Sequence, residues 1–347
     1  MRVGVLLEQC LAPVPGGTGR YSRELFRALQ QTAPAGAEVE GWTAWHRGSP
    51  WHRLPLPRRM LVAAWERGRG PAVPADVVHA PTPLHPPRRD RPLVVTVHDA
   101  VPWTHPEMLT PRGVAWHRAM ITRAAATADL VVVPTHAVAA ALARHLPLRD
   151  VLVVGEGVSP DLVVPPDADE RAARLELPEQ YLLTVATLEP RKGLRELVDA
   201  LGGPGGLGGS LPLLCAGPKG WGDGAPPRGA RLLGRVSDAD LAVLISRATA
   251  LVVPSYDEGF GLPLLEGMSL GTPVLTSDAP ALVEVAGGAA LAVPLAELRE
   301  GLREITADEG LRQRLREAGP RRASSYTWEG AAETLWRAYG DLQEQDV

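Results

Sequence analysis

Short apolar runs of four to seven residues alternate with longer stretches of helical periodicity along the whole chain. Runs that are apolar throughout indicate strands buried on both faces, and parallel strands of this kind need helical connections between them. The alternation therefore predicts an α/β protein with doubly wound parallel sheets. The predicted strands cover residues 3–7, 76–79, 93–98, 130–133 and 151–154 in the first half, and 181–187, 213–216, 231–233, 250–254, 273–276 and 290–293 in the second.

The length of 347 residues suits two domains, each with a core of its own. Residues 155–169 are rich in Pro, Gly and Asp and lack periodicity, which is typical of a linker between domains. We therefore predict a Rossmann-like N-terminal domain over residues 1–160 and a Rossmann-like C-terminal domain over residues 161–325. A last helix over residues 326–347 is expected to pack back toward the first domain.

Two local patterns predict helix starts near the C-terminus. Thr306 and Glu309 have the spacing of a capping box, in which each side chain bonds a backbone N–H of the first turn. Thr327 is expected to cap the last helix.

Composition excludes several classes of protein. With 45% apolar and 22% charged residues, the chain is neither disordered nor a coiled coil. Its two cysteines, Cys10 and Cys215, have neither the number nor the spacing of a disulfide framework or a cysteine-bound metal. No stretch reaches about 18 apolar residues, so we predict no membrane span and expect a cytoplasmic protein. No recognisable nucleic-acid-binding module accompanies the basic residues, so nucleic acid is not an expected partner.

The strongest functional signal follows the fourth predicted strand of the second half, in the segment EGFGLPLLE from Glu258 to Glu266. Ligands bind outside the carboxyl ends of the strands in such sheets. Gly259 and Gly261 let the backbone approach a ligand closely, and the free N–H groups at the following helix start attract a phosphate. The pattern predicts a phosphate site flanked by two carboxylates, with Glu266 about one turn inside the helix.

Three further signals follow other predicted strands. Arg191 and Lys192 combine a forked and a point-like cation beside a helix start, which suits a diphosphate. His98 ends an apolar strand and is a candidate for orienting a donor sugar or polarising an acceptor hydroxyl. Gly17 lies in a glycine-rich loop, GGTGRY, which comes close to a dinucleotide-binding fingerprint. Each has an ordinary structural alternative: a charged helix entry, a structural histidine and a surface loop.

Together these motifs resemble glycosyltransferase family 4, the retaining enzymes of GT-B architecture. Residues 256–274 (YDEGFGLPLLEGMSLGTPV) are similar to the E-x7-E signature of that family. The segments GGTGRYSREL, VTVHDAVPWTHPE, TLEPRKGL, CAGPKGWGD and GRVSDADLAVLISRA occur in the same order as in the family, so the resemblance covers nearly the whole chain. The TLEPRKG and GPKGW forms resemble its mannosyltransferase-like members.

The resemblance implies GT-B architecture: two Rossmann-like domains facing across a cleft, the first binding the acceptor and the second the nucleotide sugar. The implied catalytic residues are His98, Glu258, Arg191 and Lys192, and the implied donor-binding residues are Gly17, Gly259, Phe260, Gly261, Leu262 and Glu266. Glu266 is expected to hold ribose hydroxyls, and Glu258 those of the transferred sugar. Some relatives place the arginine of the phosphate clamp where this chain has Ala186. Neither a metal nor a bound cofactor is implied, because the GDP- or UDP-sugar is itself the substrate.

The predicted function is therefore retaining transfer of a hexose, with mannose favoured, from a nucleoside-diphosphate sugar to a glycan or to a glycolipid or polyprenyl-linked acceptor. A nucleotide-sugar 2-epimerase on the same fold, a dinucleotide-dependent oxidoreductase and a non-catalytic nucleotide-sugar-binding protein are the alternatives. The segment 46–70, together with Trp45 just before it, mixes arginines with Trp51 and Trp65. It is either a peripheral contact with the inner membrane face or an ordinary loop and helix of the acceptor domain.

Three other motif matches do not have the structural context that they need. The GxGxxG pattern at 203–208 lies between a helix and the next strand, the reverse of the dinucleotide-binding order. The GxSxG pattern at 267–271 follows a helix, where a hydrolase elbow needs a strand. Asp238 and Asp240 resemble a metal-binding DxD, but Ser237 more simply caps a helix there.

Overall fold

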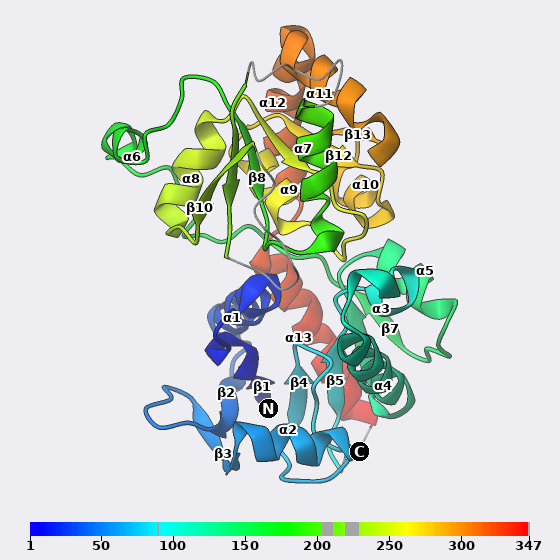
Figure 1. Cartoon of the computed structure of the whole chain (residues 1–347). Coiled ribbons are helices and arrows are strands. Elements are labelled where there is room, and N and C mark those ends of the chain that lie inside the picture. The colour runs from blue at the N-terminus through cyan, green and yellow to red at the C-terminus, as the bar shows by residue number, and fades with distance from the viewer. Residues whose placement is uncertain (89, 203–210, 219–228, 346–347) are drawn as a thin grey trace. The chain divides into compact units, whose positions relative to one another are not determined.

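The computed structural model describes residues 1–88, 90–202, 211–218 and 229–345 (Figure 1). The chain divides into two compact units, Met1–Glu156 with Thr327–Val347 and Gly157–Tyr326. The first unit is therefore built from both ends of the chain. Among the described helices, none is long and apolar enough to cross a membrane.

The first unit contains a parallel sheet of strand order β3-β2-β1-β4-β5-β6-β7. Its strands are β1 (Arg2–Leu6), β2 (Glu38–Trp45), β3 (His52–Pro57), β4 (Val77–Ala80), β5 (Leu93–Thr96), β6 (Leu130–Val133) and β7 (Val151–Val153). Its helices are η1 (Glu8–Leu11), α1 (Gly16–Gln31), α2 (Arg58–Glu66), α3 (Val101–Thr104), η2 (Pro106–Met108), α4 (Pro111–Thr127), α5 (His136–Ala143) and α13 (Trp328–Gln345).

Helices cover both faces of this sheet, as two neighbouring residues of β5 show, because their side chains point to opposite sides. Val94 packs in a cluster with residues of α1 and α13, whereas Val95 packs with residues of α2 and α4. Helix α13 lies beside α1 and buries Trp336 and Tyr339 in this unit (Figure 1). The last helix of the chain thus completes the core that the first strand begins.

The second unit contains a parallel sheet of strand order β10-β9-β8-β11-β12-β13. Its strands are β8 (Leu182–Val185), β9 (Leu213–Ala216), β10 (Ala230–Gly234), β11 (Ala250–Val253), β12 (Val274–Ser277) and β13 (Leu291–Val293). Its helices are α6 (Ala168–Arg174), η3 (Pro190–Lys192), α7 (Leu194–Gly202), α8 (Asp238–Arg247), α9 (Leu262–Ser269), α10 (Pro280–Ala286), η4 (Leu295–Glu297), α11 (Leu298–Ala307) and α12 (Glu309–Ala323). Leu182 faces the cluster with α7 and α11, and Leu183 faces the one with α8, α9 and α10.

The predicted parallel α/β architecture is confirmed, and every predicted strand is present within a few residues of its expected bounds. Strands β2 and β3 were not predicted. Residues 38–45 mix polar with apolar side chains, and β3 carries two prolines. Proline is tolerated there because β3 is the edge strand of its sheet, where a missing N–H breaks no interior ladder.

One of the two predicted helix starts differs from the structure. The capping box at Thr306 is wrong, because Thr306 lies inside α11, where its hydroxyl donates to the Leu302 carbonyl at 2.7 Å. Asp308 caps α12 instead, accepting from the Leu311 N–H at 2.9 Å. The predicted cap at Thr327 is confirmed, since its hydroxyl oxygen accepts from the Gly330 N–H at 3.0 Å.

Candidate functional site

The sheet of the second unit reverses its order beside β8, because β9 lies on one side of β8 and β11 on the other. The carboxyl ends of two such strands form the usual ligand crevice of an open α/β sheet. Helix η3, which holds Arg191 and Lys192, follows β8, and Glu258 follows β11. The Tyr256 N–H donates to the Arg191 carbonyl at 2.8 Å, so the two segments touch.

Gly193 makes this close approach possible. Its φ of +64° lies in the left-handed region that glycine adopts readily. A Cβ placed at Gly193 would lie 1.9 Å from the Pro254 carbonyl oxygen, so any other residue would push η3 away from the end of β11. The glycine therefore fixes the two cations of η3 beside Glu258.

Glu258 forms the centre of an ion-pair cluster. Its carboxylate lies 2.6 Å from Lys192 Nζ and 3.5 Å from Arg191 Nη1, and accepts a hydrogen bond from Ser255 Oγ at 2.8 Å. Arg191 also pairs with Glu189 at 2.9 Å. Burial would raise the pKa of Glu258, but the charges on Lys192 and Arg191 outweigh it and hold that pKa below its usual range. Two cations and two carboxylates therefore neutralise one another at the strand ends.

Helix α9 begins directly after this cluster. Gly261 precedes its first residue, Leu262, with a φ of +92°, and a Cβ there would lie 2.3 Å from the Leu282 side chain. Phe260 is buried in the core, where its ring packs nearly perpendicular to that of Tyr326. It can therefore offer a ligand its backbone rather than its ring. Glu266 lies one turn inside α9 and is 3% exposed.

His98 follows β5 in the first unit, and both of its ring nitrogens face protein groups. Nε2 lies 2.9 Å from the Pro81 carbonyl oxygen, and Nδ1 lies 3.7 Å from a carboxylate oxygen of Glu156. The rings of Tyr21 and His98 pack at 86° to one another, with centroids 4.6 Å apart. Burial would lower the pKa of His98, but the neighbouring Glu156, Pro81 carbonyl and Asp99 raise it above its ordinary value.

Gly17 lies in the first turn of α1, so the expected glycine-rich loop is in fact a helix start. Nothing lies within 4 Å of a Cβ placed at Gly17, and the residue is exposed. Its backbone is therefore accessible, at the amino end of a helix that follows β1.

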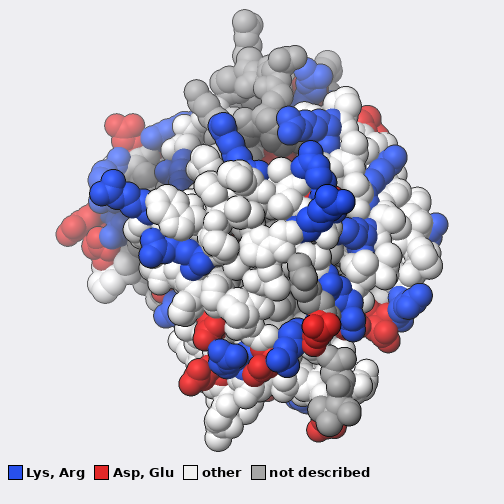
Figure 2. All heavy atoms as spheres, turned by 90° about the horizontal axis from the view of Figure 1, so that it is seen from below, with Lys and Arg blue, Asp and Glu red and all other residues white. Residues whose placement is uncertain are grey.

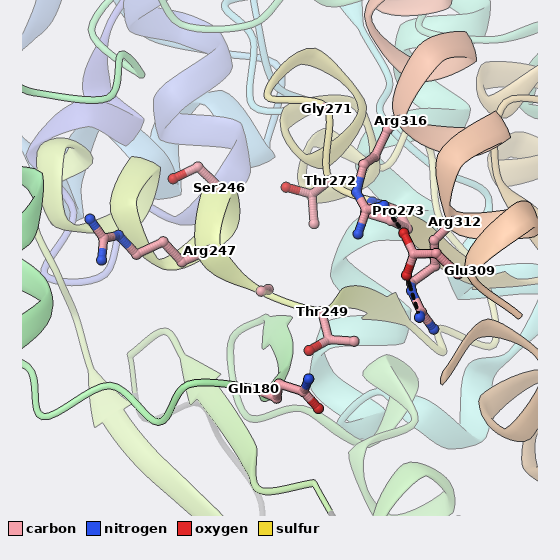
Figure 3. A pocket seen from close by; sticks show the side chains of 11 residues that line it. Gln180, Ser246, Arg247, Thr249, Gly271, Thr272, Pro273, Glu309, Arg312 and Arg316 are labelled. Carbon is pink, nitrogen blue, oxygen red and sulfur yellow. Dashed lines mark hydrogen bonds and ion pairs between the residues drawn. The ribbon is translucent and has the colours of Figure 1, made fainter. Parts of the chain in front are cut away.

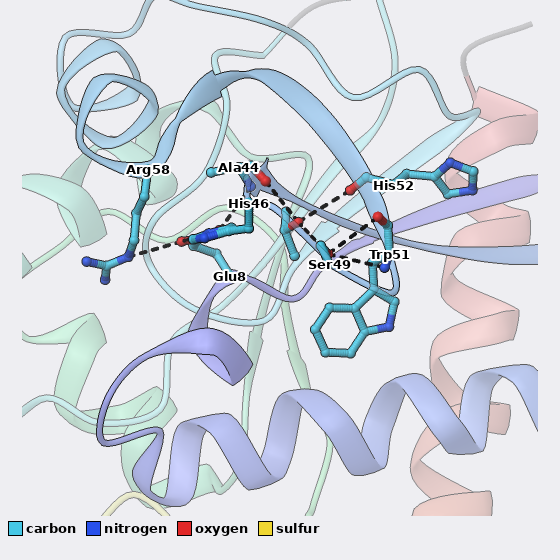
Figure 4. A network of polar contacts seen from close by, with 8 residues as sticks. Glu8, Ala44, His46, Ser49, Trp51, His52 and Arg58 are labelled. Atoms are coloured by element: carbon cyan, nitrogen blue, oxygen red, sulfur yellow. Dashed lines mark hydrogen bonds and ion pairs between the residues drawn. The ribbon is translucent and has the colours of Figure 1, made fainter.

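A buried carboxylate that the sequence analysis missed lies after β1 (Figure 4). Glu8 accepts from the Ala44 N–H at 2.9 Å, and both of its oxygens lie within 3.1 Å of His46 Nε2. Arg58 Nε lies 3.0 Å from the same carboxylate. Glu8 thereby joins the ends of β1, β2 and β3. Its one sequence signal is an acid placed directly after an apolar first strand.

A polar pocket of about 280 Å³ lies at the other edge of the second unit's sheet, because Gln180, Thr249 and Pro273 precede β8, β11 and β12 (Figure 3). Arg312 and Arg316 line it, and both pair with Glu309. It therefore lies away from the strand ends that carry Lys192 and Glu258. Within the described ranges, no group of three or more His, Cys, Asp and Glu side chains is arranged to hold a metal ion.

Solved structures with the same fold define the class. Sucrose-phosphate synthase from Thermosynechococcus elongatus superposes with a TM-score of 0.75 at 23% identity, covering 99% of both chains. HepE of Anabaena, solved in complex with UDP and glucose, superposes with a TM-score of 0.72 at 18% identity, covering 98% of this chain and 100% of the other. Identities this low concern the fold alone, and that fold is the GT-B fold of glycosyltransferases.

The family follows from the sequence. Residues 15–162 match the family described as Glycosyltransferase Family 4, and residues 227–322 match the family described as Glycosyl transferases group 1. The chain belongs to the glycosyltransferases that these two families describe, as its motifs predicted. O-antigen chain mannosyltransferase B of Escherichia coli is 34% identical over 172 residues, 46% of this chain and 45% of that protein. The chain spans about half the length, or less, of the curated relatives it matches.

Proposed function

We propose that the protein is a retaining glycosyltransferase that moves a hexose, most favourably mannose, from a nucleoside-diphosphate sugar to a glycan or lipid-linked acceptor. The observation that carries the proposal is the convergence of Lys192, Arg191 and Glu258 at the reversal point of the second sheet, directly before α9. The mannosyltransferase relative supports the sugar, and the neighbour solved with UDP and glucose supports a nucleotide-sugar donor.

The donor diphosphate would replace carboxylates as the partner of the cations. In the structure Lys192 pairs with Glu258, and Arg191 pairs with Glu189 and Glu258. A diphosphate in reach of both cations offers them stronger, charge-assisted contacts and releases Glu258 to accept hydrogen bonds from sugar hydroxyls. Glu266, buried one turn inside α9, would hold ribose hydroxyls.

Catalysis in this scheme is mainly electrostatic. Negative charge grows on the departing diphosphate as the anomeric C–O bond breaks, and Lys192, Arg191 and the amides of residues 259–262 would already face that charge. Losing one such preorganised donor typically raises the barrier by about 3 kcal/mol, on the order of a hundredfold in rate. We assign no covalent nucleophile and no metal, so chelator-treated enzyme is expected to remain active.

The first unit would hold the acceptor. His98 and Gly17, which follow strands of that unit, would act on the donor, His98 as a catalytic residue and Gly17 as a donor-binding residue. Trp45 and Met60 are 51% and 58% exposed, and Arg47, Arg58 and Arg59 are exposed near them in sequence. Figure 2 shows Lys and Arg spread over one face of the molecule around a broad uncharged area. Because exposed aromatic and apolar residues beside cations favour anionic lipid surfaces, we include peripheral membrane contact in the proposal.

The test is a screen of GDP-, UDP-, ADP- and dTDP-sugars for nucleoside diphosphate release, with and without glycan and lipid-linked acceptors. Acceptor-dependent release with one donor, with the anomeric configuration retained in the product, is the expected result. Release of nucleotide with an epimerised sugar and no acceptor would instead indicate the 2-epimerase. Donor binding without turnover for any acceptor would indicate a binding protein.

A further inference from the structure

Glu156, the last residue of the first unit before the chain crosses to the second, contacts a histidine of the proposed site. We propose that Glu156 is a positioning residue that keeps His98 protonated on both ring nitrogens, so that His98 acts as a fixed positive charge and not as a proton acceptor. The proposal rests on the proposed function for its catalytic meaning, but the protonation state can be measured without any activity.

The geometry leaves one ring nitrogen open to titration. The Pro81 carbonyl oxygen, 2.9 Å from Nε2, has no proton to donate, so Nε2 must carry the hydrogen of that contact. Nδ1 is then the nitrogen that gains or loses a proton, and it faces the Glu156 carboxylate at 3.7 Å. That distance is too long for a good hydrogen bond but close enough for strong charge attraction.

Because both side chains are buried, the charge on Glu156 also depends on the charge on His98. The side chains of Glu156 and His98 are 6% and 13% exposed. A buried carboxylate without a partner is costly, and no other cation lies within 4 Å of Glu156 in the part of the chain that the structure describes. A proton on Nδ1 therefore compensates the carboxylate, while a neutral imidazole would leave it uncompensated.

The other groups around the imidazole are compatible with this charge. Asp99, the next residue, adds a second negative charge and also acts to raise the pKa of His98. Tyr21 packs near the imidazole, and burial raises the pKa of its hydroxyl, so it stays neutral. A charge on His79 would oppose one on His98, but burial lowers the pKa of His79 to about 3, so His79 is neutral at physiological pH.

Two hydroxyl groups hold the buried ring of His79 in place. Its Nδ1 lies 2.6 Å from the Tyr339 hydroxyl, and its Nε2 lies 2.8 Å from Thr96 Oγ1. Thr96 Oγ1 in turn lies 3.3 Å from the Tyr21 hydroxyl, which holds the ring that packs on His98. Helix α13 is thereby connected to the setting of His98 through a run of buried contacts.

The consequence for the reaction is a restriction on what His98 does. An imidazole with both nitrogens protonated cannot take a proton from an acceptor hydroxyl. It can supply positive charge where negative charge grows during transfer. Of the two roles open to His98 from the sequence, the structure thus favours orienting and stabilising the donor.

Nitrogen-15 NMR of the imidazole rings tests the proposal directly, with the His98 signals assigned from their loss in His98→Gln. At pH 7 we expect both His98 nitrogens to show imidazolium shifts, and its titration midpoint to lie above the ordinary histidine value of 6.5. In Glu156→Gln the midpoint should move to lower pH, with Nε2 as the protonated nitrogen of the neutral ring, and Glu156→Asp should recover part of the difference. A neutral His98 at pH 7 in the unaltered protein would overturn the proposal without any variant, as would an unchanged midpoint in Glu156→Gln.

Glu107→Gln is the matched control, because the exposed pair of Glu107 with His105 lies 3.2 Å apart and outside the site. It should leave the His98 midpoint unchanged. Once a donor and acceptor are known, Glu156→Gln should lower kcat at neutral pH with little change in KM, and kcat should recover as the pH falls and His98 regains its proton. Absence of any transferase activity would defeat the proposed function while leaving the NMR result as it stands.

Discussion

Lys192→Ala is expected to destabilise the second unit as well as abolish transfer. Glu258, 8% exposed, would lose its partner at 2.6 Å and keep Ser255 at 2.8 Å and Arg191 at 3.5 Å. Removing one member of a buried ion pair costs about 3–5 kcal/mol in the free energy of unfolding, because the other charge is left uncompensated. Since Arg191 remains, although shared with Glu189, we expect about 2–3 kcal/mol.

Replacing Glu258 as well should restore the free energy of unfolding that Lys192→Ala loses. In the double variant Lys192→Ala, Glu258→Gln no buried charge is left without its partner, so stability should return to within about 1 kcal/mol of the original protein. Thermal unfolding should show Lys192→Ala melting about 5–10 °C lower and the double variant recovering most of this difference. Both should lose donor binding, as measured by calorimetry with UDP and GDP.

Arg316→Ala is the control for loss of a cation from an ion pair. Arg316 and Glu309 are 38% and 64% exposed, so this change should cost no more than about 1 kcal/mol. The reasoning is refuted if Lys192→Ala is as stable as Arg316→Ala, or if the double variant is no more stable than Lys192→Ala.

Three further predictions concern the same two units. Because the pKa of Glu258 is lowered, its ion pairs stabilise the fold at pH values above 4.5, the ordinary pKa of glutamate. This contribution is lost as the pH falls through the lowered pKa. The unfolding temperatures of the original protein and of Glu258→Gln should therefore converge in acid. Gly193→Ala should lower the free energy of unfolding by about 2–4 kcal/mol and impair donor binding, because its Cβ would lie 1.9 Å from a backbone carbonyl oxygen. Gly202→Ala is the control in both denaturant unfolding and binding, because a Cβ there has nothing within 4 Å. Tyr339→Phe should cost about 1–3 kcal/mol in chemical unfolding, because it leaves the buried His79 Nδ1 without its partner at 2.6 Å, and an unchanged free energy would contradict this account.

Much of the fold could be predicted because buried parallel strands have a distinctive sequence. Residues 130–133 and 213–216 are apolar throughout, and the structure places strands at those positions. Strands β2 and β3 lie at the edge side of their sheet, where polar residues and prolines are permitted, so the same signal is absent there. The predicted capping box at Thr306 was wrong for a related reason. A capping pattern is local, whereas the end of α11 depends on its packing against the sheet.

The candidate donor site was predictable in outline for a topological reason. Arg191, Lys192 and Glu258 each follow a strand, and the carboxyl ends of parallel strands share one edge of the sheet. Sequence periodicity does not give strand order, so the neighbouring positions of β8 and β11 were not available from it. Glu8 went unnoticed because its partners, His46 and Arg58, are far from it in sequence.

The sequence by itself determined the strands that are buried on both faces and the charged residues that follow them, because burial on both faces imposes a local apolar pattern. Only the tertiary structure decided that Lys192 pairs with Glu258, that Glu156 faces His98, and that Tyr339 of α13 meets His79. Each of these depends on side chains more than 50 residues apart, whose meeting is set by strand order and by the return of the chain, and no local pattern records either.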